Sequence, residues 1–172
     1  MKSKILFSIV ILGILLLITD IYLTNKIFSK KNSDKKIEQT LAMIKPDAVE
    51  AKYTGKIIDR IENEGFEIIK IKKLKLTEEK AQNFYAIHKD KSFFDDLVNF
   101  MSLGPIIVMI LQKEDGIEQW HQLMGDTNPQ KAKENTLRRI FGTNTEKNAV
   151  HGSDSPQTAK QEILFFWKKI FP

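Results

Sequence analysis

The sequence predicts an α+β fold in which a four-stranded antiparallel sheet is surrounded by helices and preceded by one N-terminal hydrophobic helix. Three observations support this prediction. Residues 66–76 alternate apolar side chains with Glu and Lys, as in a strand with one solvent-exposed face. Residues 105–111 form a continuous apolar run, which suits a strand buried on both faces. Residues 5–23 carry only Asp20 as a charged side chain, and as a helix they would extend over roughly 28 Å, close to the thickness of a bilayer core.

The remaining elements are predicted from turn and capping residues. Short strands are expected at residues 40–44 and 148–150, and residues 45–47 (Lys-Pro-Asp) are expected to start a loop, because proline cannot donate a ladder bond. Helices are expected after the N-caps Thr54, Thr77 and Ser155 and over residues 94–101, 117–124 and 136–141. This order of strands and helices fits a ferredoxin-like antiparallel sheet with helices on one face.

Composition divides the chain of 172 residues into three parts. Residues 1–25 form a predicted transmembrane anchor or signal-like segment, residues 26–37 a basic linker and residues 38–172 the folded domain. The chain has no cysteine, which excludes disulfides, thiolate catalysis and Cys-based zinc sites. The net charge of +5 suits anionic partners such as nucleotides, anionic lipid or nucleic acid, and it selects none of them.

The N-terminal segment is expected to remain as a membrane anchor, because no small-x-small cleavage site follows its apolar residues. Lys2 and Lys4 precede those residues as in a signal peptide, so a cleaved segment, with the domain cytoplasmic or exported, is the alternative. Five lysines lie within residues 26–36, and the positive-inside tendency then places the folded domain on the cytoplasmic side. These lysines have no interleaved aromatic residues, so anionic lipid is favoured as their partner over any specific nucleic acid.

Histidine is scarce, with three in the chain, and one of them has neighbours that suggest chemistry. His88 precedes Lys-Asp-Lys and is expected to be exposed and without a catalytic role. His151 ends a short apolar strand and is followed by Gly152, which leaves space around the imidazole. The helix that starts at Ser155 directs amide donors and the positive end of its dipole to the same region, which favours phosphate. On spacing alone, a functional and a structural role for His151 are equally open.

Four stretches resemble the motifs of nucleoside diphosphate kinases. Residues 148–155 (N-A-V-H-G-S-D-S) are similar to the specific signature of that family. Residues 40–47 (T-L-A-M-I-K-P-D), 89–94 (K-D-K-S-F-F), and 124–129 with 136–138 (M-G-D-T-N-P, then T-L-R) resemble it at compatible spacings. The resemblance covers about residues 39–167. It implies transfer of the γ-phosphoryl group from a nucleoside triphosphate (ATP) to a nucleoside diphosphate by a ping-pong mechanism through a phosphohistidine on His151.

The resemblance also implies residue roles. The implied catalytic residues are His151, Lys45, Glu162, Ser153 and Tyr85. His151 resembles the nucleophile, and Glu162 resembles the acceptor that orients its imidazole, with Ser153 linked to it by a hydrogen bond. Lys45 resembles the lysine that stabilises charge on the transferred phosphoryl group, and Tyr85 resembles a tyrosine close to the histidine and the phosphate.

Nucleotide contacts are implied in the same way. The implied nucleotide-binding residues are Lys45, Phe93, Leu97, His121, Thr127, Arg138 and Asn148. Phe93 resembles the aromatic residue on which the base stacks, so a broad range of bases is expected. Arg138 and Thr127 resemble groups that bind phosphates, and Asn148 resembles the asparagine that contacts the ribose hydroxyl and phosphate.

Three positions depart from the family's pattern. His121 stands where a second phosphate-contacting arginine is usual, Lys91 where arginine is common, and residues 133–135 (Lys-Glu-Asn) where a smaller segment is usual. Histidine reaches less far than arginine and carries less charge at neutral pH. We therefore expect weaker nucleotide binding with the reaction class unchanged.

The family implies Mg²⁺ as the cation of the nucleotide, held chiefly by phosphates and water, and the sequence has no obvious cluster of metal ligands. The P-loop pattern G-x-x-x-x-G-K-[ST] is absent. The resemblance also implies a homo-oligomer, a tetramer or a hexamer. The alternative function, motivated by His121 and by the altered loop at residues 133–135, is a membrane-tethered, weakly active nucleotide-binding or scaffold module with the same fold.

Overall fold

The computed structural model describes residues 17–24, 26 and 36–167. The chain divides into two units, residues 1–36 and residues 37–172. In the first unit, residues 17–24 are helical. None of the helices in the described ranges has the length and apolar character needed to cross a bilayer. Most of the predicted anchor and of the basic linker lies outside the described residues.

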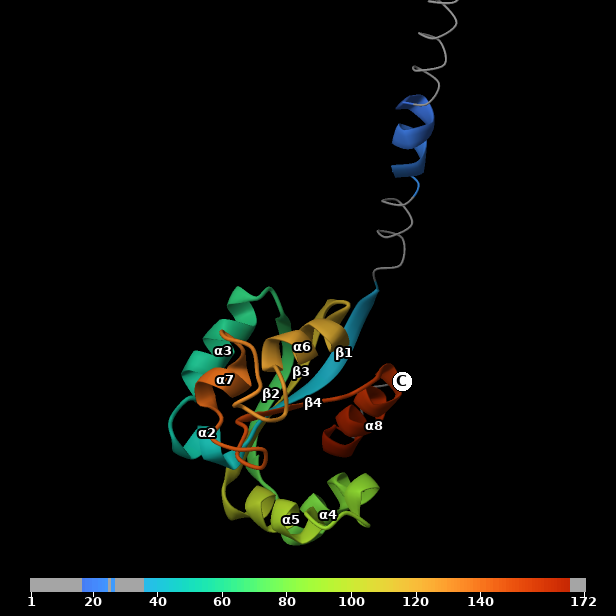
Figure 1. Cartoon of the computed structure of the whole chain (residues 1–172). Coiled ribbons are helices and arrows are strands. Elements are labelled where there is room, and N and C mark those ends of the chain that lie inside the picture. Colours follow the sequence, from blue (N-terminus) through green and yellow to red (C-terminus); the bar gives the residue numbers. More distant parts are fainter. Residues whose placement is uncertain (1–16, 25, 27–35, 168–172) are drawn as a thin grey trace, which may run out of the picture. The chain divides into compact units, whose positions relative to one another are not determined.

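The second unit contains the predicted four-stranded antiparallel sheet. Its strands are β1 (Ile37–Ile44), β2 (Glu67–Lys75), β3 (Pro105–Glu114) and β4 (Val150–Gly152). They lie in the order β2-β3-β1-β4, and each neighbouring pair is antiparallel (Figure 1). This is the ferredoxin-like arrangement expected from the order of elements, and the predicted fold class is confirmed.

Helices cover both faces of the sheet, whereas the sequence led us to expect them on one face. On one face, α4 (Glu78–Phe84), α5 (Phe94–Leu103) and α8 (Pro156–Phe166) enclose one apolar core. On the other face, α3 (Thr54–Asn63), α6 (Gly116–Met124) and α7 (Leu137–Phe141) enclose a second core.

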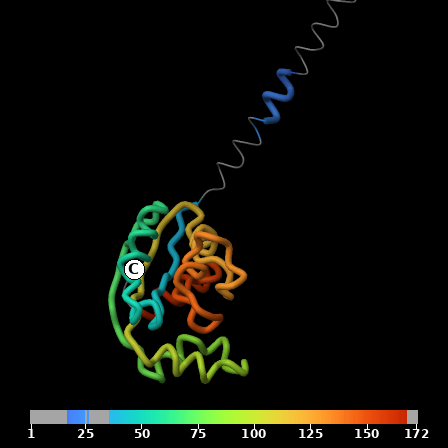
Figure 2. The backbone as a smooth tube through the Cα atoms, turned by 60° about the vertical axis from the view of Figure 1, so that its left-hand side comes forward, coloured from blue at the N-terminus to red at the C-terminus, as the bar shows by residue number. Residues whose placement is uncertain are grey.

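The reason lies in the two central strands. Leu41 and Met43 of β1 belong to one core, and Ala42 and Ile44 belong to the other. Both faces of such a strand have to be withdrawn from water, so both need a layer of helices. Figures 1 and 2 show α4 and α5 (green) as a layer below the rest of the domain.

Two local differences from the expected elements shape the functional site. The Lys-Pro-Asp stretch starts a short helix, α2 (Pro46–Glu50), because proline is well suited to the first helical position, where its missing N–H is not needed. The last strand is displaced from residues 148–150 to Val150–Gly152, because Ala149 has φ +68°, which no extended strand accommodates. His151 therefore lies within β4, paired with Met43 of β1.

The N-caps are confirmed at two of the three positions. The Thr77 hydroxyl accepts a hydrogen bond from the amide of Lys80 at 3.2 Å. Ser155 and Thr158 form a reciprocal capping box at the start of α8. Thr54 is the first residue of α3, and the cap position is held by Tyr53 without a side-chain bond.

Candidate active site

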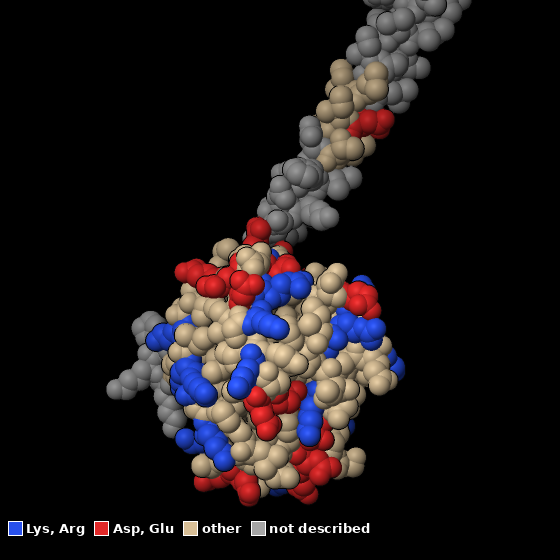
Figure 3. Space-filling model, turned by 90° about the vertical axis from the view of Figure 1, so that its left-hand side faces the viewer, with Lys and Arg blue, Asp and Glu red and all other residues tan. Residues whose placement is uncertain are grey.

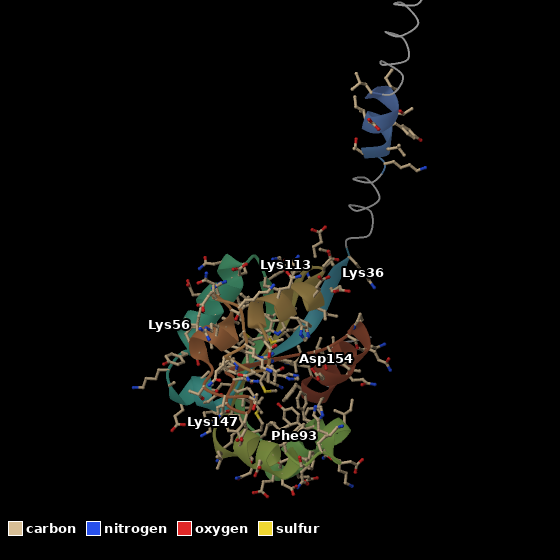
Figure 4. The ribbon with its side chains drawn as sticks, in the orientation of Figure 1. Lys36, Lys56, Phe93, Lys113, Lys147 and Asp154 are labelled. Atoms are coloured by element: carbon tan, nitrogen blue, oxygen red, sulfur yellow. The ribbon has the colours of Figure 1, made fainter. Side chains whose placement is uncertain are left out.

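A pocket of about 610 Å³ collects most of the predicted site residues. Nine of the predicted residues line it: Lys45, Tyr85, Phe93, Leu97, His121, Thr127, Arg138, Asn148 and His151. Its volume is within the range usual for small-molecule sites. In Figure 4, Phe93 lies on the α4–α5 side of this pocket and Asp154 on the side of α8. The two other predicted residues, Ser153 and Glu162, do not line the pocket and contact His151 or its partner.

The imidazole of His151 is fixed by a carboxylate. Its Nε2 lies 3.1 Å from Oε2 of Glu162 on α8, and the hydroxyl of Ser153 donates to the same oxygen at 2.6 Å. A proton on Nε2 satisfies this contact, which leaves Nδ1 with its lone pair. Burial alone would raise the pKa of Glu162, but the hydrogen bond and the charge of His151 and the bond from Ser153 lower it below its ordinary value.

The strand that carries His151 is held from behind. The indole N–H of Trp120 donates to the backbone oxygen of His151 at 3.2 Å. A side chain at Gly152 would overlap this indole, so glycine is required for close approach. Ser153 is fully buried, its amide donates to Leu41 O at 3.2 Å and its hydroxyl accepts from the Leu41 amide at 3.3 Å. These contacts leave the position of His151 little freedom.

Lys45 brings a buried cation to the end of β1. Its ammonium group donates to the backbone oxygen of Glu146 at 2.7 Å and to Oδ1 of Asn148 at 2.8 Å. The residue is only 6% exposed. Burial lowers the pKa of Lys45 to about 8; the charge of Arg138 adds to this effect, and the charges of Asp47 and Glu146 oppose it.

Asn148 organises the loop that precedes β4. Its Nδ2 donates to the backbone oxygens of Thr127 and Thr145, both at 3.0 Å, while its Oδ1 accepts from Lys45. The side chain is therefore fully engaged within the protein. It joins the Met-Gly-Asp-Thr-Asn-Pro stretch to the stretch that contains His151.

Arg138 of α7 lines the pocket. Its two terminal nitrogens donate to Gly125 O at 2.9 Å and to Val150 O at 3.2 Å. Its Nε is buried and has no partner in the described part of the chain. Burial lowers the pKa of Arg138, and the charges of Asp126 and Asp154 oppose this effect.

Aromatic rings form the wall on the α4–α5 side. The ring of Tyr85 meets His151 edge-on at 6.1 Å, and its buried hydroxyl has no partner among the described residues. Burial, followed by the charge of Glu162, raises the pKa of Tyr85. Phe93 lines the pocket and is 49% exposed. His88, which we expected to be exposed, is partly buried between Tyr85 and Phe93, at ring distances of 6.4 and 5.7 Å.

His121 enters the same pocket from α6. Its Nε2 lies 3.0 Å from the backbone oxygen of Ser153 and 3.7 Å from a carboxylate oxygen of Asp154. The ring is thus anchored on the segment that follows His151. Because Nε2 donates to this carbonyl oxygen, Nδ1 is an acceptor in the neutral ring and a donor only when the ring carries both protons.

Sequence reasoning missed several residues that the fold brings to the site. The pocket is also lined by Asp96, Thr145, Glu146 and Asp154, and Asp47 and Trp120 support it from outside. Asp47 follows Lys45 and Pro46 in the motif, which was a usable signal, whereas nothing local identified Trp120 or Asp96. The described part of the chain contains no group of three or more His, Asp or Glu residues that could hold a metal ion.

Comparison with known proteins agrees with this geometry. The profile of the family described as "Nucleoside diphosphate kinase" matches residues 38–170. The chain belongs to the nucleoside diphosphate kinase family. A nucleoside diphosphate kinase of Persephonella marina is 51% identical over 134 residues, which are 78% of this chain and 96% of that protein. Nucleoside diphosphate kinase 1 of Protochlamydia amoebophila is 53% identical over 131 residues, 76% of this chain and 93% of the other.

Solved nucleoside diphosphate kinase structures share the fold. The Aquifex aeolicus enzyme superposes with a TM-score of 0.76 at 42% identity, over 78% of this chain and 98% of that one. The Halobacterium salinarum enzyme in complex with CDP superposes with a TM-score of 0.75 at 37% identity, over 78% of this chain and 90% of that one. Residues 38–170 therefore correspond to nearly a whole nucleoside diphosphate kinase.

Proposed function

We propose that this nucleoside diphosphate kinase transfers the γ-phosphoryl group of a nucleoside triphosphate to a nucleoside diphosphate, with His151 as the covalent carrier. The contact between Nε2 of His151 and Glu162 carries the proposal. It holds the imidazole in the tautomer that leaves the Nδ1 lone pair available at the pocket.

The reaction has two mirrored steps. In the first, Nδ1 attacks the γ-phosphorus, the N–P bond forms as the bond to the bridging oxygen breaks, and the nucleoside diphosphate leaves. In the second, a terminal phosphate oxygen of another nucleoside diphosphate attacks the phosphoryl group, and the N–P bond breaks. Glu162 stabilises the positive charge that the imidazole gains, and Ser153 holds the carboxylate in position.

Lys45 and Arg138 supply the positive charge for the phosphates. The Lys45 ammonium meets the oxygens of the transferred group, and the Tyr85 hydroxyl, which has no protein partner in the described ranges, donates to the same region. Arg138 and Thr127 bind the other phosphates, and His121 adds a weaker contact through Nδ1–H when its ring carries both protons. Asn148 reaches the ribose by exchanging one of its protein partners.

The base lies on the apolar side of the pocket. Phe93 offers an exposed ring and Leu97 lines the wall beside it. Stacking on an aromatic ring is tolerant of the base, so we expect ADP, GDP, CDP and UDP all to serve as acceptors.

Mg²⁺ enters as the cation of the nucleotide. Charged residues lining the pocket are Lys45, Arg138, Asp96, Glu146 and Asp154. Three carboxylates beside two cations make a poor site for an uncompensated polyphosphate, and the divalent cation offsets this by neutralising the phosphate oxygens.

Incubation of the full chain with γ-labelled ATP and Mg²⁺, followed by addition of CDP, GDP or UDP, tests the transfer. The expected result is an acid-labile, alkali-stable phosphoprotein whose label passes into the corresponding triphosphates, and which His151→Ala abolishes. Nucleotide binding without a phosphoprotein would instead favour the tethered binding or scaffold module.

We also propose that the chain has three parts, that it associates with a membrane and that it forms a homo-oligomer. Residues 1–25 attach the protein to the membrane, residues 26–37 link them to the kinase domain on the cytoplasmic side, and the domain assembles as a tetramer or hexamer. Support comes from the apolar residues 5–23 and the lysines of residues 26–36. On the face of the domain shown in Figure 3, basic and acidic side chains are interspersed, without the single-signed patch that nucleic acid would need.

Membrane fractionation tests whether the N-terminal segment is inserted in a bilayer. The full chain is expected in the membrane fraction after a high-salt wash and in solution after detergent, while residues 38–172 stay in solution. Release of the full chain by salt alone would contradict an inserted segment.

A further inference from the structure

Asp47 is a partly buried carboxylate beside the site that the reaction just described does not use. It lies in the first turn of α2, two residues after Lys45. Its Oδ2 accepts a hydrogen bond from the amide of Ala149 at 3.0 Å. Its Oδ1 is buried and has no hydrogen-bond partner among the residues that the structure describes. A carboxylate oxygen buried without a partner is costly, so its persistence requires a compensating charge nearby.

The contacts of Ala149 show what Asp47 holds in place. Ala149 has φ +68°, a left-handed conformation that costs a non-glycine residue about 1–2 kcal/mol. It is held on both sides, because its amide donates to Asp47 and its carbonyl oxygen accepts from the amide of Lys45 at 2.8 Å. Ala149 separates Asn148, which binds the Lys45 ammonium, from Val150 and His151 in β4. Asp47 thus fixes the turn that joins the cation to the nucleophile.

The charge of Asp47 acts on Lys45. Burial lowers the pKa of Lys45 to about 8, and Asp47 is the strongest of the groups that oppose this effect. Other charged groups act on Lys45 from α7 (Arg138, which lowers the pKa) and from the loop before Asn148 (Glu146, which raises it). The remaining ionisable residues of the pocket are Tyr85, His88, Asp96, His121, His151 and Asp154.

We propose that Asp47 is a positioning residue that holds Ala149 in its left-handed turn and keeps the Lys45 ammonium charged at the pH of the reaction. This inference rests on the proposed function in one respect, the role of Lys45 in binding the transferred phosphoryl group. Asp47 itself touches no substrate atom in this assignment; it acts through Ala149 and Lys45.

Asp47→Asn separates the two roles. The amide oxygen of asparagine still accepts from Ala149, while the negative charge is lost. The kcat/KM of the full chain is measured from pH 6 to pH 9.5 for the wild type, for Asp47→Asn and for Asp59→Asn, an exposed carboxylate on α3 that serves as a matched control.

The charge role predicts a displaced alkaline limb. We expect it to move to lower pH by about one unit in Asp47→Asn, so that kcat/KM falls about fivefold at pH 8 and is nearly unchanged at pH 6. Asp59→Asn is expected to follow the wild type at every pH. A profile of Asp47→Asn that superimposes on the wild type, or that drops equally at all pH values, overturns the charge role.

The turn role predicts a different pattern. Asp47→Ala removes the acceptor of the Ala149 amide as well as the charge, and we expect kcat to fall about tenfold at pH 6, where Asp47→Asn is near normal. Equal kcat values for the two variants at pH 6 overturn the turn role.

A titration without turnover separates this inference from the proposed function. The ε-carbon resonance of Lys45, assigned by comparison with Lys45→Arg, is followed against pH in the ligand-free protein. We expect its midpoint to fall in Asp47→Asn by the same interval as the alkaline limb. A lower midpoint in a protein that transfers no phosphoryl group would uphold the coupling and reject the proposed function; an unmoved midpoint in an active enzyme would do the reverse.

Discussion

Oε2 of Glu162 is shared between two side chains: it lies 3.1 Å from Nε2 of His151 and accepts a hydrogen bond from the hydroxyl of Ser153 at 2.6 Å. The serine is fully buried and bonded to the backbone of Leu41, so the carboxylate is held by the sheet itself. The orientation of the imidazole therefore depends on a chain of three side chains that starts at β1 and ends at the pocket.

Glu162→Gln is expected to lower kcat by about 100-fold with little change in KM, because the amide cannot stabilise the imidazolium charge and no nucleotide contact is lost. Ser153→Ala is expected to lower kcat by about tenfold, since it acts through Glu162. Steady-state kinetics of both single variants and the double variant test this. The double variant should be scarcely slower than Glu162→Gln, and fully additive effects would contradict a shared oxygen.

His121→Arg is expected to lower KM for the nucleotide several-fold, because an arginine reaches further and is always charged, with kcat nearly unchanged. His121→Gln, which keeps a donor for the Ser153 carbonyl and adds no charge, is the matched control. KM values for His121→Arg at or above those of the wild type would show that this position does not meet phosphate.

The buried ammonium of Lys45 predicts a pH dependence of stability. The folded-state pKa is lowered from 10.5 to about 8, so between these values the unfolded chain binds more protons than the folded one. The free energy of unfolding attributable to Lys45 therefore rises with pH over this window. Urea denaturation from pH 7 to pH 10 should show this slope in the wild type and lose it in Lys45→Met; identical slopes would refute the depressed pKa.

Gly152→Ala is expected to destabilise the domain by about 1–3 kcal/mol, because the added methyl group meets the fully buried Trp120. Gly55→Ala in α3, where an added methyl group has no atom within 4 Å, should be neutral or stabilising by up to about 1 kcal/mol. Urea midpoints of the two variants give the comparison. A Gly152→Ala midpoint equal to that of the wild type would mean that the indole can move aside.

Much of the domain could be predicted from the sequence because its signals are local. The alternation in residues 66–76 and the apolar run in residues 105–111 each became a strand, and Ser155 became a true N-cap. The motif around His151 pointed to the residues that line one pocket. These features depend on side-chain periodicity or on neighbours a few positions apart.

What could not be predicted depends on contacts between distant residues. The hydrogen bond from the Ala149 amide to Asp47 joins positions 102 residues apart in the sequence. The left-handed backbone at Ala149 could not be predicted either, because alanine, unlike glycine, does not indicate a positive φ. The second layer of helices was missed for a related reason. An apolar strand shows that both faces are buried, but it does not show which helices cover them.

The pairing of Met43 with His151 has a consequence for heat inactivation. Lys45 directly follows the end of β1, two residues beyond Met43, and His151 lies on the neighbouring strand β4. Backbone ladder bonds between β1 and β4 therefore set the spacing of the ammonium and the imidazole. Warming that loosens the loops at the pocket mouth leaves this pair in register. Irreversible loss of phosphotransfer should therefore coincide with melting of the sheet, and an enzyme warmed to just below that transition should recover its full turnover on cooling.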